Sequence, residues 1–259
     1  MSGKTPRPIP WLLLPLLLAG VGNGLAAELW REPTTGMELV RLPAGCFSMG
    51  DGFGDGEHNE RPLHEVCLDT FWIGRHEVTQ GQWQALMGDN PSAYPGQRYP
   101  VEQVRLDEIE EFIRRLNQLG QGTFRLPSEA EWEYACRSAG QGHRFATIDG
   151  HFSPSGVNTD AEDDPWPETA PVDELAANAL GIQGMSGNLW EWVADIYAAD
   201  AYSKHSRDNP LYSQQGPSRV VRGGAWSHAP HFARCSKRHM HCRPTVRYDI
   251  IGFRLVREP

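Results

Sequence analysis

Apolar and polar side chains alternate in two stretches near the start of the chain, residues 37–50 and 66–73. This period of two is typical of half-buried strands. An acidic, glycine-rich loop separates the two stretches, so we expect them to pair with one another. Such pairing would bring Cys46 close to Cys67. Sequence alone does not fix disulfide connectivity, so a bond between these two cysteines is one of several possibilities.

The pattern changes to a helical one in three later segments. Thr79 and Gln82 form a capping box, in which each side chain caps the backbone of the other, and predict the start of a helix. Ser128 and Glu131 form another capping box and predict the start of a second helix. Between them, apolar residues spaced three and four apart over residues 106–119 predict an amphipathic helix. The rest of the chain is rich in turn-forming residues, which favours loops and short strands.

Composition supports an irregular architecture. The 259 residues include 27 Gly, 20 Pro and nine Trp, which is a turn-rich and aromatic mixture. No internal repeat or linker divides the chain, so we expect one domain with a substantial core. The formal charge of −9 argues against nucleic-acid binding and against an anionic membrane surface. The same charge is favourable for binding cations.

The N-terminus has the layout of a secretory signal. Lys4 and Arg7 are basic, Trp11–Val21 is apolar, and small residues that suit cleavage follow. The apolar run is too short to span a bilayer comfortably. We therefore predict a signal peptide at residues 1–27 and a mature domain at residues 28–259, with an uncleaved anchor as the alternative. The mature chain would contain no membrane span and would act in an oxidising compartment, the periplasm.

In such a compartment cysteines are interpreted first as disulfides. The odd number leaves one over. The chain has five, namely Cys46, Cys67, Cys136, Cys235 and Cys242.

Three blocks of sequence resemble the formylglycine-generating enzyme family, also called the sulfatase-modifying-factor family. The resemblance implies a single irregular α+β domain that is related to C-type lectins and has little regular secondary structure. The blocks occur in the family's order and span nearly all of the mature chain. The first holds Met49-Gly50, residues 60–66, 71–73 and 77–79; the second is Arg125–Ala135; the third holds Gly184–Trp192, Arg222–Gly224 and Gly252–Arg254.

The resemblance implies structural calcium, which prefers several carboxylate, amide and carbonyl oxygens. The first site would use the side chains of Asn158 and Asp164 and the carbonyls of Thr159 and Trp166. A solvated acidic loop is the alternative interpretation of this segment.

A second calcium site would use the carbonyls of Gly187 and Leu189 and the Glu191 carboxylate. Here the chain departs from the family, because Gly184 stands where an Asn or Asp side chain would coordinate. Water can substitute for one lost ligand in a flexible oxygen cage, so the departure weakens this site. The alternative for Glu191 is a structural carboxylate paired with an arginine.

The family also implies a disulfide between Cys136 and Cys235. Active members bind copper(I) through two cysteine thiolates, the soft ligands that this ion selects. Residues 225–234 occupy the place of that loop here and contain no cysteine. We therefore expect no copper and no oxidation by the family mechanism, and we interpret Trp226, His228 and His231 as a recognition loop.

The residues in and after this loop allow two further chemical hypotheses. His228, His231, His239 and His241 are grouped closely enough to suggest a metal site, against the simpler interpretation of ordinary loop histidines. Cys242 beside His239 or His241 could be a nucleophile if its pKa were low. A further hypothesis is structural. We expect four arginines to form ion pairs with acidic motif residues such as Glu131, Glu133 and Glu191. These arginines are Arg234, Arg238, Arg243 and Arg247.

Three functional hypotheses follow. The first is a non-catalytic periplasmic binding or regulatory protein with a protein partner. The family includes a periplasmic regulator of type VI secretion that acts upstream of a transmembrane Ser/Thr kinase, so the kinase's periplasmic domain is a candidate partner. The second is a periplasmic oxidase of the pyoverdine-maturation type, which works without the copper cysteines. The third is a lectin-like binder whose groove is lined by Trp190, Trp192 and Trp226, although buried core is the commoner role of tryptophan.

Overall fold

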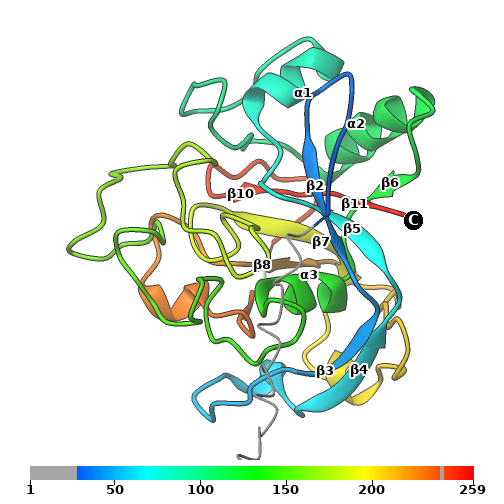
Figure 1. The fold of residues 1–259 in the computed structure, drawn as a ribbon, viewed down its shortest axis with the longest axis vertical. Coiled ribbons are helices and arrows are strands. Elements are labelled where there is room, and N and C mark those ends of the chain that lie inside the picture. The colour runs from blue at the N-terminus through cyan, green and yellow to red at the C-terminus, as the bar shows by residue number, and fades with distance from the viewer. Residues whose placement is uncertain (1–27, 240–241) are drawn as a thin grey trace, which may run out of the picture.

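The computed structural model describes residues 28–239 and 242–259, so the predicted signal peptide and His241 lie outside the described residues. Short elements alternate with long loops, as the composition indicates (Figure 1). The helices are α1 (Gln80–Met87), α2 (Leu106–Gln118) and α3 (Glu129–Cys136), with 3-10 turns η1 (His58–Glu60), η2 (Ala201–Ser203) and η3 (Pro230–Ala233). The strands are β1 (Leu29–Arg31), β2 (Glu38–Leu42), β3 (Gly45–Met49), β4 (His64–Leu68), β5 (Phe71–Gly74), β6 (Phe124–Arg125), β7 (Trp190–Ile196), β8 (Arg219–Arg222), β9 (Arg238–His239), β10 (Ile251–Gly252) and β11 (Val256–Arg257).

The two alternating stretches pair, as predicted, but each is broken into two strands. β2 pairs antiparallel with β5, and β3 pairs antiparallel with β4. β2 and β5 belong to a five-stranded sheet in the order β1-β2-β5-β11-β6, whereas β3 and β4 form a separate two-stranded sheet. In Figure 1 the β3–β4 pair lies at the end of the molecule opposite α1 and α2. The C-terminal strand β11 therefore lies between elements from the first half of the chain.

The helices begin where the capping boxes predict. Thr79 accepts from the Gln82 N–H at 3.3 Å, and Ser128 accepts from the Glu131 N–H at 3.1 Å. α2 buries the apolar face of its amphipathic pattern, and Phe112 on that face stacks on Trp83 of α1 with ring centroids 5.4 Å apart. These contacts join the two helices beside the five-stranded sheet.

α3 differs from an amphipathic helix, because every one of its residues is buried. The apolar residues Trp132 and Ala135 face the core as expected. Glu129 and Glu133 are fully buried as well, and arginine side chains meet both carboxylates inside the protein. The helix thus lies in the middle of the molecule and packs against β3, β4, β7 and β8.

A second sheet has the strand order β10-β7-β8-β9. Its central strand β7 carries Trp190 and Trp192, both fully buried. β8 ends at Arg222, immediately before the loop that the sequence singled out. Within the described residues, no helix has the length and apolar character needed to cross a membrane.

Candidate functional site

The recognition loop leaves β8 through a turn at Gly223 and Gly224, whose φ angles are +105° and +79°. A side chain at Gly224 would lie 3.0 Å from the Ala233 Cα, so the loop closes tightly on itself. The Trp226 N–H donates to the Asn188 carbonyl at 2.9 Å. Asn188 lies in the segment before β7, so the loop is fastened to the second sheet.

The predicted loop residues are brought together with aromatic side chains from distant segments. Trp226 packs edge-on against Tyr94, with ring centroids 5.6 Å apart. His228 lies 5.8 Å from the Trp190 ring, which stacks on His239 at 4.9 Å. Tyr94 comes from the loop that follows α1, and nothing in the sequence pattern indicated its place here.

His231 is exposed, and its ring lies against Phe232 at 4.2 Å. The half-buried His228 lies against the same Phe232 ring at 5.2 Å, and burial, with the nearby charge of His231, lowers the pKa of His228. The rings of His228 and His239 are 6.4 Å apart, and no group of three or more His, Cys, Asp or Glu side chains within residues 28–239 and 242–259 is placed to hold a metal ion.

Several buried nitrogens in this loop and on the neighbouring strand β7 find no hydrogen-bond partner among the described residues. They are Trp190 Nε1, Trp226 Nε1 and His228 Nδ1. An indole N–H is a donor only, and leaving it unpaired inside a protein costs free energy. These groups are buried, so their hydrogen-bonding capacity is left unused inside the fold and is not exposed at the surface.

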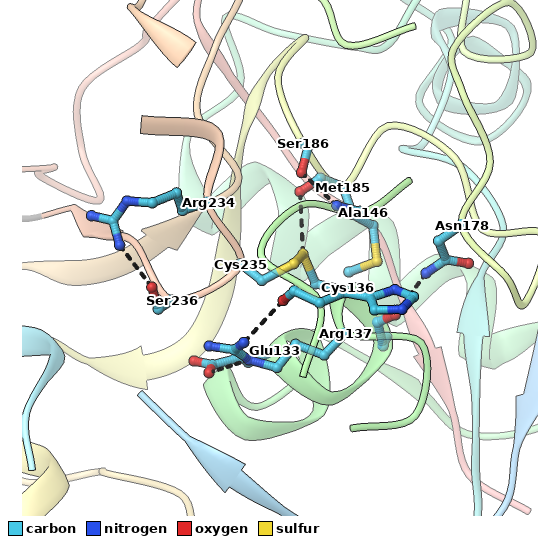
Figure 2. The surroundings of a disulfide bond; sticks show 12 residues. Glu133, Cys136, Arg137, Ala146, Asn178, Met185, Ser186, Arg234, Cys235 and Ser236 are labelled. Carbon is cyan, nitrogen blue, oxygen red and sulfur yellow. Dashed lines mark hydrogen bonds and ion pairs between the residues drawn. A yellow bond between two sulfur atoms is a disulfide. The ribbon is translucent and has the colours of Figure 1, made fainter. Parts of the chain in front are cut away.

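The cysteines nearest the loop are not available as thiolates. Cys235 is bonded to Cys136, which confirms the pairing that the resemblance implied, and Figure 2 shows this disulfide beside Met185 and α3. Cys46 is bonded to Cys67, so that second pairing is also confirmed. Cys242 is the free cysteine, and burial raises the pKa of its thiol to about 12. Such a thiol is almost entirely protonated at neutral pH, which argues against the nucleophile hypothesis.

The first set of predicted calcium ligands is gathered in one loop. The Asp164 carboxylate accepts from the N–H groups of Thr159 and Trp166 at 2.5 and 2.8 Å, and burial raises its pKa. The Asn158 Nδ2 donates to the Glu168 carbonyl, while the buried Asn158 Oδ1 has no partner among the described residues. An amide oxygen without a hydrogen-bond partner and a carboxylate in one loop are the ligand types that calcium prefers.

The second predicted set is less suited to calcium. Both Glu191 oxygens already accept from the Arg254 guanidinium at 2.7 Å, and Oε2 also accepts from the Trp132 indole N–H. These contacts match the alternative interpretation of Glu191, that of a structural carboxylate paired with an arginine.

Glu77 is another buried carboxylic acid near the second predicted calcium set. The sequence predicted no role for it. A Cβ at Gly184 would lie 2.7 Å from the Glu77 Oε2, so the glycine leaves room for this carboxylate. Burial, with the nearby charge of Glu191, raises the pKa of Glu77 to about 8. Its position in the Glu77–Thr79 part of the first block was the available signal, but its partners lie more than 100 residues away.

Arginines brace the motif carboxylates, but the predicted partners were wrong. Arg234 binds Glu60, Arg238 binds Glu129, and Arg247 binds Glu108, whereas Arg243 is exposed. Charge alone did not specify which arginine each carboxylate meets across the fold. The carboxylates named in the sequence are paired with other arginines: Glu131 with Arg125, Glu133 with Arg137 and Arg222, and Glu191 with Arg254.

Comparison with known proteins supports the fold described above. The family model described as "Sulfatase-modifying factor enzyme 1-like domain" matches residues 26–259. The solved structure of PvdO from Pseudomonas aeruginosa superposes with a TM-score of 0.81 at 28% identity, covering 90% of this chain and 99% of PvdO. The formylglycine-generating enzyme of Streptomyces coelicolor is 27% identical, over 86% of this chain and 90% of that enzyme.

Two further relatives carry other names. The chaperone protein LppX of Paenibacillus barcinonensis is 30% identical, over 83% of this chain and 88% of its own. The serine/threonine-protein kinase Pkn1 of Chlamydia trachomatis is 29% identical over 92% of this chain, which spans 44% of the kinase's length. Taken together with the α+β, C-type-lectin-like fold, these matches place the chain in the sulfatase-modifying-factor family, the family of the formylglycine-generating enzymes.

Proposed function

We propose that this protein is a non-catalytic periplasmic binding and regulatory protein built on a formylglycine-generating-enzyme scaffold. The observation that carries the proposal is the recognition loop, which contains no cysteine between Gly224 and Arg234. The flanking Cys235 is held in a disulfide, and Cys242 is a buried, protonated thiol. Copper(I) chemistry needs thiolates, and none is offered at this loop.

The same loop has the composition of a recognition surface. Tryptophan is enriched at the energetic centres of protein interfaces, and Trp226 is half-buried with its N–H unpartnered among the described residues. That N–H is itself buried, so a partner would contact the exposed part of the Trp226 side chain. His228 in the same loop is also half-buried.

The kinase relatives support a signalling context. The matched region covers 44% of Pkn1, so a domain of this kind occurs within a serine/threonine kinase chain. We propose that the partner here is the periplasmic domain of a transmembrane Ser/Thr kinase, with regulation of type VI secretion as the output. LppX, described as a chaperone, supports a binding role on the same scaffold.

Binding of the mature protein, residues 28–259, to the periplasmic domains of the host's membrane kinases tests this proposal. We expect one kinase domain to bind and Trp226→Ala to weaken that binding by about tenfold or more, because a central tryptophan contributes at least about 1.4 kcal/mol. Leu29→Ala is the matched control, since Leu29 is 49% exposed on β1. Absence of binding to every kinase domain, with normal phosphorylation and secretion in a deletion strain, would refute the proposal.

We also propose that calcium is a structural cofactor at the loop of Asn158, Thr159, Asp164 and Trp166. The side-chain oxygens of Asn158 and Asp164 would bind the ion together with the backbone carbonyls of Thr159 and Trp166. The partnerless Asn158 Oδ1 is the structural feature that supports this set over the one containing Glu191. The ion would supply charge compensation for the half-buried Asp164 and would link the ligands of this loop.

Calcium is expected to raise the melting temperature of the chelator-treated protein. A ligand at about 100 times its Kd stabilises a folded protein by about 2.7 kcal/mol. Asp164→Asn should abolish most of this shift, whereas Asp163→Asn, a neighbouring acid outside the set, should keep it. Equal shifts in the two variants would assign calcium to general screening of the acidic loop.

A second candidate function is periplasmic oxidation of a pyoverdine-type precursor. The observation that favours it is the cluster of His228, His239 and Trp190, which gathers imidazoles at the loop without cysteines. Metal analysis of the purified protein distinguishes the candidates. Copper or iron lost on His228→Ala, together with accumulation of unoxidised precursor in a deletion strain, would favour the oxidase, and calcium alone would favour the binding protein.

A further inference from the structure

The disulfide between Cys46 and Cys67 differs in setting from the other one. The two cysteines lie directly opposite one another on β3 and β4, and Cys46 is exposed while Cys67 is half-buried. β3 pairs with β4 on one side and has no second strand partner in this two-stranded sheet. Cys46 is therefore the more accessible cysteine of the pair.

A strap formed by residues 205–209 covers the other side of Cys67. The Cys67 N–H donates to the Arg207 carbonyl, and the Cys67 carbonyl accepts from the Asn209 N–H, both at 2.8 Å. The backbone of Cys67 thus lies between β3 and the strap, and the half-buried Cys67 is less accessible than the exposed Cys46. Attack by an incoming group is open at Cys46 and hindered at Cys67.

The strap also places beside the disulfide an arginine, Arg207, which is ion-paired with Glu65 and Asp208. The Arg207 guanidinium donates to the Cys46 Sγ at 3.8 Å and pairs with Glu65 at 2.7 Å. Thiol–disulfide exchange proceeds by attack of a thiolate and release of a thiolate. A guanidinium at this distance attracts the attacking thiolate. It also stabilises the leaving thiolate of Cys67, whose sulfur is bonded to that of Cys46.

The disulfide between Cys136 and Cys235 provides the contrast within the same molecule. Both of its cysteines are fully buried, and Figure 2 shows the disulfide beside α3, Met185 and Ser186. No comparable access exists there without opening the core.

We propose that Cys46–Cys67 is a thiol–disulfide exchange site for a thioredoxin-type dithiol protein. The partner's thiolate attacks the Cys46 Sγ, the bond between Cys46 and Cys67 breaks, and Cys67 leaves as a thiolate that takes a proton from solvent. The partner's second thiolate then attacks the mixed disulfide and releases Cys46. Two electrons pass to this protein, and the partner's dithiol becomes a disulfide.

Trapping tests the site of attack. The oxidised mature protein is incubated with a thioredoxin-type protein whose resolving cysteine is replaced by serine, and the adduct is mapped by peptide mass spectrometry. We expect a mixed disulfide on Cys46 and none on Cys136 or Cys235. An adduct on Cys67 overturns the proposal. The absence of any adduct, under conditions in which the same trap reacts with a small aromatic disulfide, also overturns it.

Rates test the role of Arg207. Reduction of Cys46–Cys67 by dithiothreitol should slow about fivefold in Arg207→Gln at low salt, the effect of one charge at about 4 Å near water. Arg98→Gln is the control, because Arg98 is an equally exposed, ion-paired arginine in another loop. A wild-type rate in Arg207→Gln, or reduction of both disulfides together, counts against the assignment.

Discussion

Asp195 shows how burial changes the chemistry of a single residue. Its carboxylate accepts from the backbone N–H groups of Glu129 and Tyr212 at 2.7 and 2.8 Å. Burial, with the charge of Glu129 nearby, raises the pKa of Asp195 to about 7. In the unfolded chain the pKa of this carboxyl returns to about 3.9. The folded state therefore holds the extra proton between about pH 4 and pH 7.

This linkage predicts a pH-dependent difference between the wild type and Asp195→Asn. A raised folded-state pKa means that the contribution of Asp195 to stability falls as pH rises through this window. The variant loses one backbone hydrogen bond but lacks the titrating charge. Relative to the wild type, its urea midpoint should therefore improve steadily from pH 4 to pH 7. A constant difference across these pH values would contradict the assignment.

Cys242 carries the second prediction at this scale. Because burial raises the pKa of its thiol to about 12, we expect no alkylation by iodoacetamide in the native protein at pH 8. After unfolding in urea without reductant, one alkyl group should add at Cys242, as counted by intact mass. Rapid native labelling would mean that this thiol is reachable and would reopen its chemical role.

At the scale of elements, the capping boxes locate the helices because they act within four residues. Ser128→Ala should lower the free energy of unfolding by about 1 kcal/mol, the usual loss for a helix N-cap. Thr79→Ala at α1 should cost a similar amount through the same bond to the third backbone N–H. Urea unfolding measures both, and Ser128→Thr, which keeps the hydroxyl, should restore most of the loss.

α3 also shows where element patterns stop being informative. Glu129 and Glu133 occupy positions that a sequence pattern assigns to solvent, yet both are fully buried. Arg222, itself fully buried, donates to the two carboxylates at 3.2 and 2.5 Å. A buried charge is tolerated only when it is paired, so this helix depends on an arginine 89 and 93 residues away.

At the scale of the whole molecule, the two disulfides should contribute unequally to stability. The chain-entropy model gives about 4.7 kcal/mol for a loop of about 100 residues and about 3 kcal/mol for one of about 20. Cys136 and Cys235 are 99 residues apart, and Cys46 and Cys67 are 21 apart. Replacing the first pair with alanine should therefore lower the urea midpoint more than replacing the second. The reverse order would show that local strain or residual structure dominates.

The sequence by itself determined that the two alternating stretches pair, where the helices begin and that the recognition loop contains no cysteine. These follow from local periodicity, from capping contacts over three residues, and from composition, none of which needs the fold. The family resemblance added the disulfide between Cys136 and Cys235, which the structure confirms.

Only the tertiary structure decided which charges meet and which groups remain unpartnered. Arg254 reaches Glu191 across 63 residues, and Glu77 reaches Asn188 across 111. Such pairs depend on how loops without periodic patterns return to the core, so residue type alone left them open. Burial likewise set the states of Asp195 and Cys242, because the pKa of a side chain depends on the water that the assembled fold removes.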